Sequence, residues 1–123
     1  MRRIPGAIAL LALMTVLLTG CASGQRTLPE RQIALEATSE QVLNAGLDAL
    51  VERGFVIRFA NTELGRINAV FAARPGYEVR LTTSTIPAGT RLTLSGHQGG
   101  RAIDPQRFDS LLVEITSRIE SER

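Results

Sequence analysis

The chain has 123 residues, which is the size of one domain. Its 44% hydrophobic and 21% charged residues are ordinary for a globular protein, which excludes fibrous and low-complexity classes. All 14 basic residues are arginine, but the net charge of +2 disappears without Arg2 and Arg3, because 12 arginines then balance 12 acidic residues. The composition therefore gives little support to a nucleic-acid partner, and we expect none.

Residues 1–20 have the three zones of a secretory signal peptide. Arg2 and Arg3 form a positive start, residues 4–18 carry no charge, and two small residues precede Cys21, the only cysteine. The apolar run is shorter than the roughly 20 residues of a membrane-spanning helix, and a retained membrane anchor is the alternative interpretation. A single cysteine excludes an intrachain disulfide.

Residues 18–21 read Leu-Thr-Gly-Cys, and Cys21 would be the first residue of the mature chain. This stretch resembles the lipobox of bacterial lipoproteins, in which the cysteine sulfur carries a diacylglycerol thioether and the signal is cut before the cysteine. The resemblance implies that Cys21 is the lipidation site and that acyl chains such as palmitate bind the protein to membrane lipid. Ala22 and Ser23 follow, without the Asp typical of enterobacterial lipoproteins kept at the inner membrane. The resemblance thus implies the periplasmic face of the outer membrane.

The alternatives for Cys21 are an inert small residue and a catalytic thiol, and no neighbouring histidine would activate such a thiol. The polar stretch that follows, residues 22–30, contains Gly and Pro and has no apolar period, so it predicts a flexible tether. The expected organisation is a signal peptide over 1–20, the lipidated cysteine and tether over 21–30, and one domain over 31–120.

The domain is expected to open with a short strand and a helix. Ile33 and Leu35, two residues apart, predict a strand within 31–38. Residues 38–54 predict a helix that starts with a capping box between Thr38 and Gln41, with Ser39 as an alternative cap, and stops at Gly54. Its apolar stripe is expected to contain Leu43, Leu47, Leu50 and Val51, with Gly46 on the same side.

Alternating segments separated by turn sequences predict four further strands. In the first of them, Phe55, Ile57 and Phe59 are expected to share one face. Turn residues such as those of Asn-Thr-Glu-Leu-Gly and Ala-Arg-Pro-Gly separate the strands. The expected strands are 55–59, 66–72, 77–85 and 90–96.

A Gly-rich loop over 97–103 is expected to lead into the last helix, with Asp104 as N-cap and Pro105 in its first turn. One apolar face of that helix contains Phe108, Leu111, Leu112, Ile115 and Ile119. The order β-α-β-β-β-β-α predicts an α+β two-layer sandwich: an antiparallel sheet of four to five strands with two helices on one face.

This arrangement, together with the stretch TSEQVLNAGLDALVERGFVIRFANTELGRINAVF, resembles small bacterial lipoproteins. The helix-grip domains of the BamC-type outer-membrane assembly lipoproteins share it. The resemblance covers roughly residues 31–120, implies a binding or scaffold module, and carries over no catalytic residue.

The residues that could act in catalysis or metal binding form no recognisable catalytic set. His97 is the only histidine, and a metal site would need more His or Cys ligands than the chain holds. The segment Gly-His-Gln-Gly-Gly-Arg lacks the P-loop pattern. Asp104 and Asp109 are explained by capping and by the helix dipole. We therefore expect no enzyme, no cofactor and no metal, with an unrecognised envelope hydrolase as a minor alternative.

The outward strand positions form the remaining candidate site. They include Arg58, Arg80, Thr82, Arg91 and Thr93, together with Asn68 and Ser95. This surface predicts either a docking face for a polar ligand or protein partner, or the solvated side of an amphipathic sheet. The expected function is a membrane-anchored cell-envelope lipoprotein with a non-catalytic protein-interaction or scaffold role. The alternative is a small-ligand or lipid-binding module with a pocket between helices and sheet.

Overall fold

The computed structural model describes residues 29–122, so Cys21, the predicted signal peptide and most of the tether lie outside the described residues. The elements are β1 (Arg31–Leu35), α2 (Ser39–Glu52), β2 (Val56–Asn61), β3 (Arg66–Phe71), β4 (Tyr77–Ile86), β5 (Gly89–Gln98), β6 (Arg101–Ala102), η1 (Pro105–Phe108) and α3 (Asp109–Ser121). Within this range, no helix has the length and hydropathy needed to cross a membrane.

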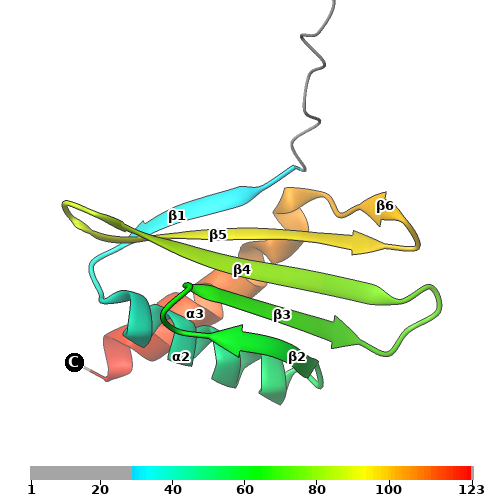
Figure 1. The fold of residues 1–123 in the computed structure, drawn as a ribbon, viewed down its shortest axis with the longest axis horizontal. Helices are drawn as coiled ribbons and strands as arrows, with labels where there is room; N and C mark the ends of the chain where they lie inside the picture. Colours follow the sequence, from blue (N-terminus) through cyan, green and yellow to red (C-terminus); the bar gives the residue numbers. More distant parts are fainter. Residues whose placement is uncertain (1–28, 123) are drawn as a thin grey trace, which may run out of the picture.

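The strands form one antiparallel sheet in the order β1-β5-β4-β3-β2, with β6 paired to β5. Within residues 29–122, α2 and α3 lie on one face of this sheet and the other face carries no helix (Figure 1). The predicted α+β sandwich is therefore confirmed. Strands β2 to β5 follow one another as hairpins, whereas β1 lies beside β5, with Ile33 opposite Leu92.

The core fills the space between the sheet and the two helices. Its fully buried members include Leu50 of α2, Leu81 of β4, Leu94 of β5 and Ile115 of α3. All five apolar positions predicted for the last helix are buried. Val51 was expected in the stripe of α2 but is 56% exposed, because it lies about 100° round the helix from Leu50.

The start and end of α2 follow from local chemistry. Thr38 Oγ1 accepts a hydrogen bond from the Gln41 amide at 3.1 Å, and the Thr38 amide donates to Gln41 Oε1 at 2.9 Å. The predicted capping box is thus confirmed. The helix ends before Gly54, whose φ of +88° is a conformation that glycine adopts readily.

Strand β2 differs from its predicted alternation. Its register against β3 shifts between Ile57 and Phe59, so that Ile57 lies opposite Ala69 while Phe59 lies opposite Asn68. An extra residue in one strand reverses the side on which the following residues point. Phe59 therefore lies on the helix-free face, and the expectation that it shares a face with Ile57 is wrong.

The predicted loop over 97–103 is partly strand. His97 and Gln98 extend β5, and they pair with Ala102 and Arg101 of β6 across a turn formed by Gly99 and Gly100. Asp104 then caps a single 3₁₀ turn by accepting a hydrogen bond from the Gln106 amide at 3.0 Å. The α-helix itself begins at Asp109, later than the sequence predicts.

Candidate interaction surfaces

The helix-free face of the sheet contains most of the polar site that the sequence predicts. Thr82 lies opposite Thr93, Arg80 lies between Asn68 and Ser95, and Ser84 lies opposite Arg91. Directly opposed residues point to the same face, so the register brings Arg80, Thr82, Arg91 and Thr93 together. Arg58 lies at the β2 bulge, is exposed, and has no partner in the β2–β3 register.

Sequence reasoning missed Arg66 on this face. It lies opposite Thr82, and its guanidinium carbon is 5.3 Å from the centroid of the Phe59 ring. This cation–π contact depends on the bulge that turns Phe59 outward. Within residues 29–122, Arg58, Arg66, Arg80 and Arg91 make no ion pair.

On the helix side, unlike on the helix-free face, three arginines form ion pairs with carboxylates. Arg31 of β1 contacts Asp109 at 2.9 Å, and Arg53 contacts Glu114 at 2.7 Å. Arg118 lies 3.2 Å from Glu114 and also pairs with Glu52. The hydrogen bond from Arg53 lowers the pKa of Glu114, with desolvation opposing it and Arg118 adding to it. These contacts join α2, α3 and β1 at the surface.

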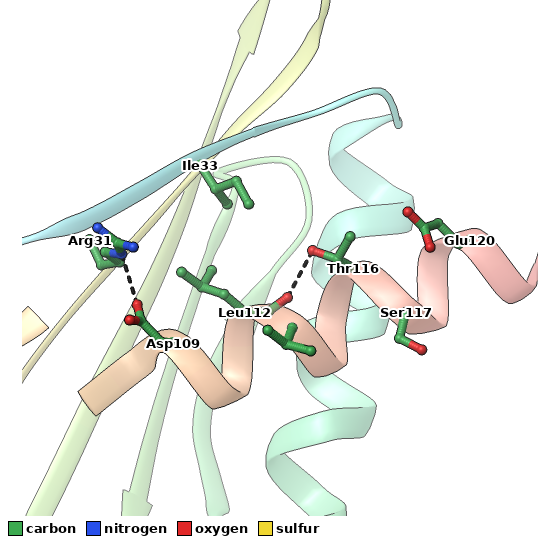
Figure 2. Close-up of a pocket in the computed structure, with 8 residues that line it drawn as sticks. Arg31, Ile33, Asp109, Leu112, Thr116, Ser117 and Glu120 are labelled. Atoms are coloured by element: carbon green, nitrogen blue, oxygen red, sulfur yellow. Dashed lines mark hydrogen bonds and ion pairs between the residues drawn. The ribbon is translucent and has the colours of Figure 1, made fainter. Parts of the chain in front are cut away.

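A groove of about 560 Å³ runs between the edge strand β1 and helix α3. Figure 2 shows the Arg31–Asp109 ion pair at one end, Glu120 at the other, and Ile33 and Leu112 between them. A second hollow of about 240 Å³ shares Ile33 and Glu120 and continues the groove toward the end of β1. Val113 of α3 also lines the groove and is 70% exposed, a high value for a valine on a helix that packs against a sheet.

A second concave surface, the aromatic cleft, lies where several elements end. It has a volume of about 390 Å³ and is lined by Arg53, Phe55, Phe71, Ala73, Tyr77, Gln98 and Arg107. The Phe55 ring lies 5.4 Å from Phe71 and 5.6 Å from Tyr77, between centroids, with tilted planes. Three of the five aromatic residues of the chain are therefore gathered at this one place.

The aromatic cleft also contains two cations. Arg107 lies over the Tyr77 ring at 5.4 Å and donates a hydrogen bond to Gln98 Oε1 at 3.1 Å. Burial raises the pKa of Tyr77, and the charges of Arg107 and Arg53 oppose that rise. An apolar wall with two guanidinium groups is an arrangement suited to an anion that carries an apolar group.

The other residues considered from sequence lie at the margin of the helix-free face or serve the fold. His97 lies opposite Glu78 and Ala102 and lines a hollow of about 110 Å³ with Arg80 and Ser95. Asp104 and Asp109 are engaged in the cap and in the ion pair to Arg31. Over residues 29–122, no three His, Cys, Asp or Glu side chains are grouped so as to hold a metal ion.

Comparison with known proteins gives no functional assignment. No family model matches the sequence, and no curated protein matches it either. Among solved structures, the chain is similar to protein CV1439 from Chromobacterium violaceum, with a TM-score of 0.47 and 15% sequence identity. The match covers 76% of this chain and 94% of that one.

Proposed function

We propose that this protein is a lipid-anchored module of the bacterial cell envelope, on the periplasmic face of the outer membrane, that binds a protein partner without catalysing a reaction. The observation that carries the proposal is the order of segments along the chain. A signal-like segment ends in Leu18-Thr19-Gly20-Cys21, and a compact domain begins ten residues later with strand β1. That order suits a domain that works beside a membrane.

The length of the tether sets the working distance. Residues 22–30 separate Cys21 from Arg31, and an extended chain spans at most about 3.3–3.6 Å per residue. The tether therefore reaches about 30 Å, roughly the thickness of the hydrocarbon core of a bilayer. The attached end of the domain, at Arg31, therefore stays within this distance of the membrane surface.

The groove between β1 and α3 is the surface that best suits such a partner. In the described part of the chain, β1 pairs with a strand on one side only, so its other edge has free backbone donors and acceptors. An extended segment of an envelope protein could add to this edge while its side chains cover Ile33 and Val113. The backbone bonds would supply affinity, and the groove would select side chains.

The anchoring part of the proposal is tested by Cys21→Ser. The wild-type protein is expected to incorporate radiolabelled palmitate in cells and to be processed to the mature form. The variant is expected to incorporate none and to accumulate as precursor. Label on the variant, or normal processing of it, would contradict the anchor.

The binding part is tested with a photo-crosslinking amino acid at Ser117, in the groove, and at Val51 on α2 as the control. Val51 is exposed on the other helix and does not line the groove. A defined protein adduct is expected from position 117 alone, and it should disappear when Val113→Asp is added. Equal adducts from both positions, or an adduct that Val113→Asp leaves unchanged, would contradict docking in the groove.

A second candidate function is the binding of a small ligand, and the aromatic cleft favours it. The core fills the space between sheet and helices, so the cleft at the end of the sandwich is the place where such a ligand would fit. Tyr77 is the only tyrosine, and the chain has no tryptophan, so its fluorescence reports on this cleft alone. Titration with fatty and aromatic carboxylates should change that fluorescence in wild type and not in Arg107→Gln. An unchanged signal in wild type would contradict this function.

A further inference from the structure

Charge is divided between the two layers of the sandwich. Strands β2 to β5 carry four arginines and one glutamate. Helices α2 and α3 together carry six carboxylates and one arginine. The domain is nearly balanced as a whole, but its sheet layer is positive and its helix layer is negative.

The arginines of β2 to β5 differ from those of the helix side in making no ion pair within residues 29–122. Arg31, Arg53 and Arg118 on the helix side each contact a carboxylate. On the sheet, Arg80 and Arg91 are exposed and have no ion-pair partner within residues 29–122. Their guanidinium groups are therefore available to an external anion, and guanidinium binds phosphate with two parallel hydrogen bonds.

Apolar side chains accompany these arginines at the β2 side of the same face. Phe59 is 38% exposed beneath Arg66, and Val56 is 64% exposed opposite Val70. Amphipathic helices that lie in a membrane interface combine basic residues with large apolar ones. This face of the sheet has the same combination of arginine with exposed Phe and Val. The arginine stems can cover apolar surface while their charged ends stay at the level of the headgroups.

The tether does not decide which layer faces the membrane. It enters the domain at Arg31, at the start of β1, and β1 is an edge of the sheet (Figure 1). A chain attached at an edge lets the domain turn either layer toward the bilayer. The difference in charge between the layers then determines the orientation, because an anionic surface attracts the sheet layer and repels the helix layer.

We propose that the helix-free face of the sheet, centred on Arg66, Arg80 and Arg91, is a docking surface for anionic phospholipid headgroups. It holds the anchored domain flat on the bilayer. The inference rests on the proposed anchoring at Cys21 for the proximity of the membrane. In this orientation the helix layer and the groove between β1 and α3 remain accessible to a partner.

The orientation can be measured without relying on lipidation in cells. Cys21 is the only thiol, so the chain of residues 21–123 can be coupled to a maleimide phospholipid and placed in vesicles. The chain has no tryptophan, so Ser84→Trp on the sheet face and Val113→Trp on α3 each give a single fluorescent reporter. Lipids that carry a nitroxide at the headgroup quench a reporter that lies against the bilayer.

In vesicles with anionic phospholipid, the Ser84→Trp reporter is expected to be quenched at least twofold more than the Val113→Trp reporter. The difference should vanish in purely zwitterionic vesicles and at about 0.5 M salt, where charges are screened within a few ångströms. Adding Arg80→Glu and Arg91→Glu should abolish it. The matched pair Arg74→Glu and Arg101→Glu, exposed positions outside β2 to β5 with the same change of charge, should leave it intact.

Equal quenching of the two reporters, or stronger quenching of Val113→Trp, would overturn the proposal. A difference in quenching that does not depend on vesicle charge would also overturn it. The same holds for a difference that is removed equally by Arg80→Glu with Arg91→Glu and by Arg74→Glu with Arg101→Glu. If the sheet face served an acidic protein instead, the reporters would be quenched equally in vesicles. Because the lipid is attached chemically, a lack of palmitate label in cells would count against the proposed function and not against this surface.

Discussion

At the scale of single residues, Glu114 of α3 is a carboxylate that binds two arginines, one at the end of α2 and one in its own helix. It accepts hydrogen bonds from Arg53, which follows α2, and from Arg118 of α3. These bonds stabilise its ionised form, so its pKa in the folded protein lies below the ordinary value of 4.5. Proton binding is then weaker in the folded state than in the unfolded state.

This difference predicts a pH dependence of stability. The contribution of Glu114 is present above about pH 4.5 and is lost as the pH falls through its lowered folded pKa. Glu114→Gln should lower the free energy of unfolding at pH 7 by less than about 1 kcal/mol, because the pair is partly exposed. Urea unfolding at pH 7 and pH 3.5 should show a smaller loss on acidification in the variant. An equal loss in both proteins would contradict the role of Glu114.

Gly96 is a residue at which any side chain is costly. A Cβ atom there would lie 2.4 Å from the Glu78 carbonyl oxygen, 2.9 Å from Ile103 and 3.3 Å from Phe108. The first of these neighbours is backbone of the paired strand and cannot rotate away.

We expect Gly96→Ala to destabilise the domain by about 2 kcal/mol, as overpacking in a closed core does. Gly76→Ala is the matched control, because a Cβ atom there meets nothing within 4 Å. Thermal unfolding followed by circular dichroism would show a lowered midpoint for the first variant only. Similar midpoints for the two variants would show that β4 and β5 can separate to accept the methyl group.

At the scale of elements, α2 depends on its first turn. The helix has an acidic residue near its start, Glu40, and no basic residue in its last turn. The capping box of Thr38 and Gln41 therefore provides most of the local support at the end that meets β4, where Ser39 Oγ lies 2.6 Å from Thr83 Oγ1.

Thr38→Ala is expected to cost about 1 kcal/mol of stability, the usual value for a lost N-cap. Thr62→Ala, an exposed threonine in the β2–β3 turn, should change stability by less than about 0.5 kcal/mol. Chemical denaturation of both variants measures the difference. A neutral Thr38→Ala would mean that packing of the buried stripe alone determines where α2 begins.

Elements with long local patterns were predictable from sequence, and non-local features were not. Helix α3 carries a hydrophobic period from Leu111 to Ile119, and Tyr77, Val79 and Leu81 alternate with polar residues in β4, so the faces of both elements followed directly. The bulge in β2 leaves the composition of the strand unchanged and alters only its register, so Phe59 was placed on the wrong face. The short β6 strand depends on a pairing with β5 that no hydrophobic period reveals.

The candidate surfaces show the same division. The polar face could be predicted because alternation along β4 and β5 places Arg80, Thr82, Arg91 and Thr93 opposite the core residues. The groove could not, because it needs β1 and α3 side by side, and more than 70 residues separate them in the chain. The aromatic cleft likewise joins the ends of several elements. Val113, an apolar residue on the outward side of α3, was the one local sign of the groove.

At the scale of the whole molecule, the sheet and the two helices of residues 29–122 enclose one hydrophobic core. Its buried hydrophobic members in this range extend from Leu35 to Ile119, so both layers contribute to it. Removal of residues 21–28 from the mature chain should therefore change the free energy of unfolding by less than about 0.5 kcal/mol. Urea denaturation of the two chains, 21–123 and 29–123, tests this. A loss of more than about 1 kcal/mol would show that the tether packs on the domain.

The position of β1 has a mechanical consequence. The tether continues directly into β1, which is antiparallel to β5 over five paired residues, from Arg31 opposite Leu94 to Leu35 opposite Thr90. A pull on the tether along the strand axis loads all of these pairs at once, instead of opening them one after another. Ile33 and Leu35 resist the same pull by packing against or within the core. Tension between a partner and the membrane would thus be carried by shear across one short strand, which acts as the mechanical link of the protein.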